Sequence, residues 1–317
     1  MSKFQETRRD FIKTASLVAG AAIAGQFIAG EANAQGGIAA YGDVLRDTVD
    51  LHIHCSPDDT TRKDNGLVFA QMAKAAGQKA ILLKTHLGST YDQAFFTRLT
   101  VDFPVYAAIT LNLTTTGTDV LNPFAVEKEI EKGDYFGHLL KYVWLPTHSS
   151  MVQAPTRGYV PIRVVDDNLN PLPETLKVME LCAEHDLCLG TGHSDPLHGL
   201  ALAKKAKEIG VNKFIITHAT TSAYFYTLEQ VQEALSYGAY VELVYISVGR
   251  TFSMAQQAEY LRLDPNKVFI ATDLGQVNNP YPTDGLKMYI EALKEEGITD
   301  EQIDMAIRTI PAKLIDV

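Results

Sequence analysis

Short apolar runs recur between residues 48 and 273, and each is closed by polar or turn-forming residues. The runs are too short for helices, and several are rich in Val, Ile and Leu, as expected of strands that are buried on both faces. The pattern therefore predicts a series of buried strands. The eight predicted strands are 48–53, 79–86, 105–111, 142–148, 187–193, 214–219, 239–245 and 268–273.

Segments with helical spacing of apolar residues fill the intervals between these runs. Regular alternation of strand and helix favours parallel strands joined by right-handed crossovers, and the eight strands are the number that closes a (β/α)8 TIM barrel. A doubly wound open sheet is the alternative, but no glycine-rich phosphate loop follows an early strand. The predicted helices are 66–77, 91–100, 123–132, 174–185, 200–210, 228–238, 254–263, 284–296 and 300–309.

The N-terminal segment differs in character from the rest of the chain. Arg8 and Arg9 are followed two places on by Phe11 and then by an uncharged stretch, 14–30, and an Ala-x-Ala sequence ends at Ala34. This segment resembles a twin-arginine signal peptide. A membrane anchor is the alternative, but glycines interrupt the run, and about 20 strongly apolar residues are needed to span a bilayer. We expect cleavage after Ala34, recognition by the twin-arginine export machinery, and a periplasmic or secreted product.

Residues 1–34 are thus interpreted as the cleaved signal and residues 35–317, 283 of the 317, as one barrel domain, for which about 250 residues is usual. The whole chain carries a formal net charge of −10 and the signal segment +1, so the mature part carries −11. This charge argues against nucleic acid or an anionic membrane surface as a partner, and no later segment is long and apolar enough to span a bilayer. The three cysteines have no repeating spacing, which indicates buried thiols rather than a disulfide framework.

Candidate ligands gather where the predicted strands end. His52 and His54 are two residues apart, so their side chains leave a strand on the same face, and the turn-forming Ser-Pro-Asp sequence follows them directly. In an α/β barrel the chemistry lies at the C-terminal ends of the strands. Six of the nine histidines fall there. The strand-end residues are His52, His54, Lys84, His86, Asn112, His148, His193, His218, Glu242 and Asp273.

These residues resemble the amidohydrolase superfamily of metal-dependent hydrolases. The resemblance rests on the His-x-His of strand one, the strand-end residues His193, His218 and Asp273, and the closing segment Ile-Pro-Ala-Lys-Leu at 310–314. It implies that His52, His54 and Asp273 hold one divalent metal ion, and that His193 and His218 complete that site or a second one. Imidazole and carboxylate ligands suit Zn²⁺ first, with Mn²⁺ or Fe²⁺ as alternatives.

One departure from the family concerns the residue that bridges two metal ions. Binuclear members usually take a carboxylated lysine from strand four, where this sequence has no lysine. Lys84, at the end of strand two, is a metal ligand if it is carboxylated, and otherwise a cation that orients substrate or pairs with Asp273. Whether the site holds one ion or two stays open.

The ligand types predict hydrolysis of a small amide, lactone or ester by a metal-activated water, with Asp273 as the catalytic residue that takes and returns the proton. Substrate-binding candidates are His86 and His148 at strand ends, and Arg157 and Arg163 in the long connection after strand four, whose guanidinium groups suit a carboxylate or phosphate. An aromatic segment, 220–226, is expected to form a pocket wall.

Other functions remain open alongside this one. Phosphoesterases of the polymerase and histidinol phosphatase type also begin with Asp-x-His-x-His, but they close on an Asp-x-His that is missing after Asp273. A decarboxylase or lyase with one metal ion would use the same barrel, and a periplasmic metal-binding protein would need no catalysis. Association into a homo-oligomer is a further expectation that the sequence leaves open.

Overall fold

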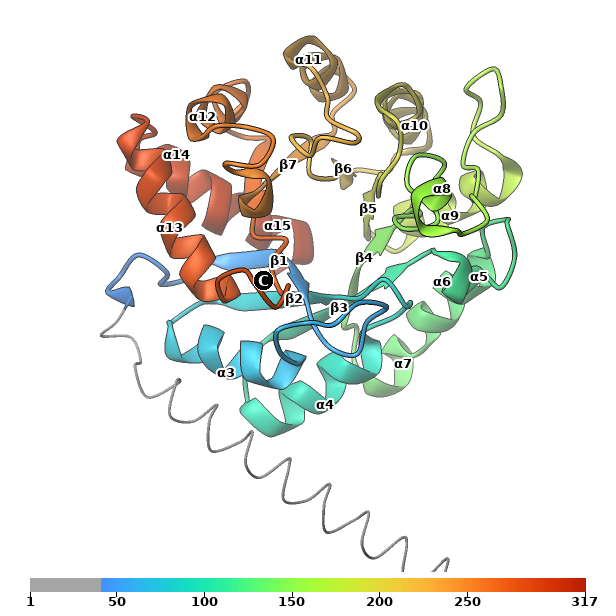
Figure 1. The fold of residues 1–317 in the computed structure, drawn as a ribbon. Coiled ribbons are helices and arrows are strands. Elements are labelled where there is room, and N and C mark those ends of the chain that lie inside the picture. Colours follow the sequence, from blue (N-terminus) through green and yellow to red (C-terminus); the bar gives the residue numbers. More distant parts are fainter. Residues whose placement is uncertain (1–40) are drawn as a thin grey trace, which may run out of the picture.

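A computed structural model describes residues 41–317 as a nearly closed barrel of eight parallel strands in the order β1 to β8, surrounded by helices (Figure 1). The predicted (β/α)8 TIM barrel is confirmed, and the open sheet is excluded. The signal peptide predicted at residues 1–34 lies outside the described residues. The strands are β1 (Val49–His54), β2 (Ala80–Lys84), β3 (Val105–Thr110), β4 (Leu140–Trp144), β5 (Cys188–Gly190), β6 (Phe214–Ile216), β7 (Tyr240–Val244) and β8 (Val268–Ala271).

The barrel closes where β8 meets β1. The backbone N–H of Asp273 donates to the carbonyl of His52 at 2.9 Å, and that of His54 donates to the carbonyl of Leu274 at 2.8 Å. Just below, the buried carboxylate of Asp50 accepts a hydrogen bond of 2.6 Å from the Thr272 hydroxyl. The end of β1 and the loop after β8 are therefore held side by side, which places their polar side chains together.

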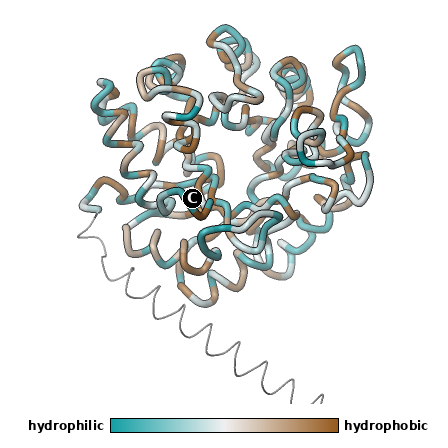
Figure 2. Tube along the Cα trace, viewed as in Figure 1, coloured by the Kyte–Doolittle hydropathy of each residue, from teal (hydrophilic) through white to brown (hydrophobic). Residues whose placement is uncertain are grey.

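Every predicted helix is present, with ends shifted by a few residues. Hydrophobic segments (brown) and hydrophilic segments (teal) alternate along the outer helices (Figure 2). Short helices within the loops after β3 and β4, which have little periodic pattern, were not predicted. The helices are α3 (Gly66–Ala75), α4 (Tyr91–Val101), α5 (Leu113–Thr116), α6 (Pro123–Glu131), α7 (Gly133–Phe136), α8 (Ala154–Arg157), α9 (Pro173–Glu184), α10 (Pro196–Ile209), α11 (Leu228–Ser236), α12 (Met254–Leu261), α13 (Pro282–Glu295), α14 (Asp300–Asp304) and α15 (Ile310–Ile315). A 3-10 turn, η1 (Tyr245–Ser247), follows β7, and a π-helical turn, η2 (Met305–Thr309), joins α14 to α15.

The apolar core has two parts. The larger part packs between the strands and the surrounding helices, and the smaller part fills the barrel and includes residues of the last helix, α15. Within the barrel, the rings of Tyr142 and Trp144 stack with centroids 3.7 Å apart, and both side chains are fully buried. The barrel interior is thus packed solid beneath its C-terminal end, as in other α/β barrels, and leaves that end for polar side chains.

A register shift in β1 turns its histidines toward the barrel axis. Leu51 belongs to the core inside the barrel, whereas Ile53 packs in the outer core, and the pairing of β1 with β2 shifts between Asp50 and Ile53. Without the shift, Leu51 and Ile53 would share one face of the strand. Because of the bulge, Leu51 and then both histidines, His52 and His54, point to the inside of the barrel.

Several observed strands end earlier than predicted. His86, His148, His193, His218 and Asp273 lie in the loops directly after their strands rather than within them. In these positions the backbone leaves the sheet, and both His218 (φ 33°) and Asp273 (φ 52°) adopt the left-handed conformation. Among residues 41–317, no helix has the length and apolar character needed to cross a bilayer.

Candidate metal centre

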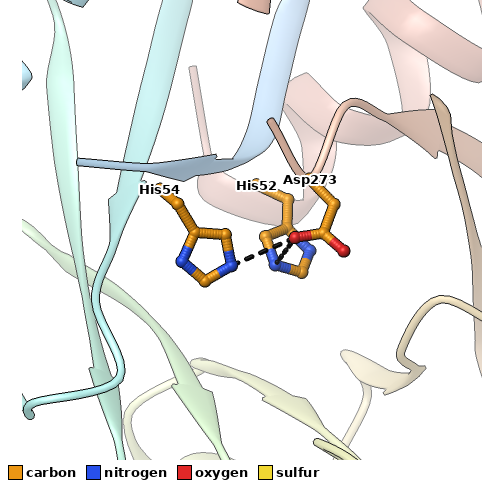
Figure 3. A group of neighbouring side chains, drawn as sticks. All are labelled: His52, His54 and Asp273. Atoms are coloured by element: carbon orange, nitrogen blue, oxygen red, sulfur yellow. Dashed lines mark ion pairs between the residues drawn. The ribbon is translucent and has the colours of Figure 1, made fainter. Parts of the chain in front are cut away.

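Three side chains converge at the C-terminal end of the barrel. The Oδ1 atom of Asp273 lies 3.2 Å from His52 Nε2 and 3.0 Å from His54 Nε2 (Figure 3). One ligand atom from each of the three residues lies within 4.8 Å of the others. The structure thus brings together, from β1 and from the loop after β8, the three residues that the sequence analysis assigned to one ion.

A buried carboxylate orients His52 from behind. His52 Nδ1 lies 3.1 and 3.2 Å from the two carboxylate oxygens of Glu242, which also accepts the backbone N–H of His218 at 3.0 Å. Because Lys84 Nζ donates to His52 Nε2, His52 carries its proton on Nδ1 and donates it to Glu242, and the lone pair of Nε2 is on the side of Asp273. Burial, with Lys84 as the next cause, lowers the pKa of His52 to about 3, which keeps the ring neutral.

His54 is placed by a second group of charged side chains. Its Nδ1 lies 2.9 Å from Arg62 Nη2 and 3.4 Å from Asp58 Oδ2, and Arg62 and Asp58 form an ion pair of 2.6 Å. Arginine only donates, so its bond to Nδ1 requires the proton of His54 to be on Nε2, facing Asp273. Binding a metal ion through Nε2 requires that proton to leave Nε2. In this structure His54 therefore presents an N–H group, and not a lone pair, to Asp273.

Lys84 lies against the same ligands. Its Nζ donates to His52 Nε2 at 2.9 Å and lies 4.4 Å from the centre of a Trp144 ring. The side chain is fully buried, and burial lowers the pKa of its ammonium group to about 8. One nitrogen lone pair cannot accept from Lys84 and bind a metal ion at once, so metal binding requires Lys84 to give up this hydrogen bond.

Six imidazole rings form a closed circle around the end of the barrel. Neighbouring rings in the circle have centroids 3.5 to 6.0 Å apart. The three histidines that the circle leaves out lie elsewhere in the chain. In order around the circle the residues are His52, His54, His86, His148, His193 and His218.

His193 and His218 lie beside the first three ligands and not in the helix layer. The His218 ring lies 5.8 Å from that of His52 and 4.9 Å from that of His193, measured between centroids. His193 Nδ1 lies 2.5 Å from Gln153 Oε1, whereas the buried Nδ1 of His218 has no hydrogen-bond partner among the described residues. Burial is the leading cause that lowers the pKa of both rings well below the usual range.

A divalent metal ion fits this donor set. Neutral imidazoles and a carboxylate are the ligands that Zn²⁺ and similar ions take, and ligating histidines usually donate their second ring N–H to a carboxylate or carbonyl. The Glu242–His52 pair supplies that arrangement, and the unpartnered ring nitrogen of His218 lacks the hydrogen bond that a buried polar atom normally has.

The site opens into a cavity of about 550 Å³. His86 and His148 stack on its wall with centroids 3.5 Å apart, and His148 Nδ1 lies 2.5 Å from Asp59 Oδ2. Arg157 and Tyr224 line the same cavity, so the aromatic segment predicted as a wall does contribute to it. Arg163 does not reach it. Its side chain is half exposed on the outside of the long loop, where it pairs with Asp167.

The sequence analysis missed the residues that support the ligands. Glu242 was recognised only as a strand end, Asp58 only as part of a turn, and Arg62 not at all. A further group of possible ligand atoms, from His54, Asp58 and His86, also lies within 4.8 Å, but Asp58 already pairs with Arg62 and accepts the backbone N–H of His86 at 2.7 Å. The one usable signal was the acidic and basic side chains directly after the Asp-x-His-x-His sequence, which in a barrel lie above the first strand.

Fold and site together define this protein as a (β/α)8 barrel with a histidine-rich candidate metal centre at the C-terminal ends of its strands. The chain belongs to the family DUF6282, described as a family of unknown function, whose pattern matches residues 47–242. That match includes His52, His54, His193, His218 and Glu242 and ends before Asp273. No curated protein matches the sequence.

Solved structures of known proteins share the fold. They include YJJV, a TatD homologue from Escherichia coli K12, with 14% identity over 86% of this chain and 99% of that one at a TM-score of 0.58. The phosphotriesterase homology protein from Escherichia coli, complexed with phosphate in its active site, has 14% identity over 85% and 98% at 0.56. A phosphotriesterase-like lactonase mutant from Deinococcus radiodurans has 13% identity over 86% and 97% at 0.56. At these identities the likeness establishes the barrel and its topology.

Proposed function

We propose that this protein is a metal-dependent hydrolase of a small amide, lactone or ester. The observation that carries the proposal is the convergence of His52, His54 and Asp273 on one point at the mouth of a 550 Å³ cavity. A cavity of this size suits a small molecule. Proteins of the same fold include one named as a lactonase and one named as a phosphotriesterase homologue, which supports hydrolysis as the class of reaction.

The resident cofactor in this proposal is a divalent ion, Zn²⁺ first, held by His52, His54 and Asp273 with His193 and His218 beside them. When bound, such an ion lowers the pKa of a coordinated water to about 7 and polarises a carbonyl oxygen. Whether a second ion joins depends on Lys84, whose buried amine lies 2.9 Å from His52 Nε2.

Asp273 is the residue proposed to move the proton. Its carboxylate lies between the two β1 histidines and faces the cavity, and its side chain is 13% exposed. Burial raises the pKa of this carboxyl above its usual range, which brings it closer to the pKa expected of an efficient proton acceptor at neutral pH. His148, with its Asp59 partner, lines the same cavity and is the second group that could accept a proton from a bound substrate.

The test combines metal content with turnover. Purified protein is reconstituted with Zn²⁺, Mn²⁺ or Fe²⁺, dialysed, analysed for metal, and assayed with 4-nitrophenyl acetate, γ-butyrolactone, a simple amide and 4-nitrophenyl phosphate. Wild type should retain metal and hydrolyse a carboxylic substrate, and His52→Ala should lose both. His185→Ala, on an exposed histidine outside the circle, is the matched control and should behave as wild type. If the protein retains metal but hydrolyses no substrate, it is a metal-binding protein and not a hydrolase of these classes. If it hydrolyses only the phosphoester, the proposed amide, lactone or ester hydrolysis is wrong and phosphoester hydrolysis takes its place.

We also propose that the protein is exported through the twin-arginine machinery to the periplasm or beyond. The proposal is supported by Arg8, Arg9 and the Ala-x-Ala sequence that ends at Ala34. N-terminal sequencing of the exported protein should start at Gln35. Replacing Arg8 and Arg9 together by Lys should retain the precursor in the cytoplasm, and export that continues unchanged in this variant would refute the assignment.

A further inference from the structure

The cavity above the candidate metal centre carries positive charge in an acidic protein. Three arginines line it, from the loops after β1, β4 and β7, while the whole chain has a formal net charge of −10. Asp273, assigned above to the metal ion, is the one carboxylate among the lining residues. The arginines are Arg62, Arg157 and Arg250.

Two of these three arginines form no ion pair with a carboxylate among residues 41–317. Arg62 is buried and its guanidinium is paired with Asp58 at 2.6 Å, so it has a structural partner. Arg157 has no ion pair or hydrogen bond among residues 41–317, and the carboxylate of Asp59, which is bound to His148, acts on Arg157 only electrostatically. Arg157 therefore offers a complete guanidinium group to the cavity.

Arg250 is held in place by neutral groups only. Its Nη2 donates to Asn279 Oδ1 at 2.7 Å, Asn279 Nδ2 donates to Gln276 Oε1 at 2.7 Å, and Gln276 Nε2 donates to the backbone carbonyl of Asp273 at 2.8 Å. This chain of amides links the exposed guanidinium to the metal-binding loop. An amide oxygen orients an arginine without cancelling its charge, whereas a carboxylate would do both.

We propose that the substrate carries an oxyanionic group, a carboxylate or a phosphate, which Arg250 and Arg157 bind while the scissile bond lies over the candidate metal centre. The proposal rests on the hydrolase function proposed above and names its substrate class. Guanidinium groups match the two oxygens of a carboxylate or phosphate, and uncompensated charge in a concave site raises the local concentration of anions. The remaining lining side chains near the loops, such as Thr60, Thr61 and Asn278, are neutral and polar and would not repel such a group.

The test measures binding, which does not require turnover. Metal-containing protein is titrated by calorimetry with two matched pairs of probes: glutarate against its neutral diamide glutaramide, and glycerol 3-phosphate against glycerol. At least one anion should bind at least tenfold more tightly than its neutral partner. A preference in the first pair alone identifies a carboxylate, and one in the second pair alone identifies a phosphate. Equal binding within both pairs would overturn the proposal.

Variants separate the arginines from the metal ion as the source of that preference. Arg250→Gln and Arg157→Gln should each weaken anion binding by about 10- to 100-fold, the range for one charged hydrogen-bonding partner, and leave the neutral probe unchanged. Arg163→Gln, on the outside of the same loop as Arg157, is the matched control. Anion binding that persists in both cavity variants would mean that the anion binds the metal ion directly, and would refute the role of the arginines.

Asn279→Asp is the most specific variant. It is nearly isosteric and keeps a partner for Arg250, but it adds the charge that the native amide lacks and removes the N–H donor to Gln276. A merely structural Arg250 would be unaffected or better held, whereas an anion-binding Arg250 should lose its preference for the charged probe. If the metal-containing wild-type protein prefers the anions but hydrolyses none of the test substrates, the hydrolase proposal alone is refuted. If it hydrolyses neutral esters but shows no preference for the anions, this inference alone is refuted.

Discussion

Glu242→Gln tests whether the buried carboxylate behind His52 is part of the metal centre. Glu242 is fully buried, and its two oxygens accept from His52 Nδ1 at 3.1 and 3.2 Å and from the His218 backbone at 3.0 Å. A glutamine has one oxygen, so its amide N–H group must face either His52 or the His218 N–H, where a donor meets a donor. The variant therefore keeps the volume but misorients a ligand.

The expected magnitude is a 10- to 100-fold weaker metal affinity, the usual effect of losing a group that orients a ligand, or about 1.4 to 2.8 kcal/mol. Competition with a fluorescent chelator gives the dissociation constant, and circular dichroism checks that the fold is retained. Glu259→Gln, on the exposed face of α12, is the control. If the Glu242→Gln variant binds metal as tightly as wild type, either His52 is not a ligand or its tautomer does not depend on this carboxylate.

Three further predictions, two of them with a milder substitution for comparison, follow from the structure. Asp273→Asn should lower turnover by at least about 100-fold while metal content falls less, because the amide oxygen still coordinates but the base is lost; near wild-type turnover at full metal occupancy would remove Asp273 from the mechanism. Asp50→Ala leaves the buried N–H groups of His52 and Thr272 without their acceptor, so the free energy of unfolding should fall by about 1–3 kcal/mol for each group. This loss would be measured as a lower midpoint of thermal unfolding, and Asp50→Asn, which keeps an acceptor oxygen, should lose less. Gly275→Ala should prevent normal folding, because the new Cβ would lie 1.8 Å from the His54 carbonyl oxygen at a φ of +132°. At Gly210 a new Cβ meets nothing within 4 Å, so Gly210→Ala should cost only about 1–2 kcal/mol in urea unfolding, for the left-handed backbone conformation.

The architecture was predictable because local and global signals agree in this chain. Each buried strand is a short apolar run, each helix has an apolar face, and eight alternations leave little choice of topology. The ends of the strands were less predictable. The sixth strand was predicted at 214–219, but β6 ends at Ile216. The backbone leaves the sheet there, because His218 adopts the left-handed conformation. The hydropathy pattern reflects burial and not backbone conformation. Because the loop residues 217–219 are as buried as β6 itself, the pattern does not show where the strand ends.

The arrangement of the site shows which physical information a single sequence carries and which it lacks. His52 and His54 share a face by simple alternation, and that inference needed only the period of a strand. The same alternation would have placed Leu51 and Ile53 together, and the bulge that separates them depends on how β1 pairs with β2, a contact 30 residues away in the chain. The supporting hydrogen bonds depend on still longer separations: Glu242 reaches His52 across 190 residues. Arg157 and Arg163 looked equivalent in one loop, but only the former faces the cavity, because Arg163 lies where Asp167 can pair with it. The candidate ligands can therefore be predicted from residue type and strand position. The groups that set the tautomers and charges of these ligands cannot, because closure of the barrel brings them in from distant parts of the chain.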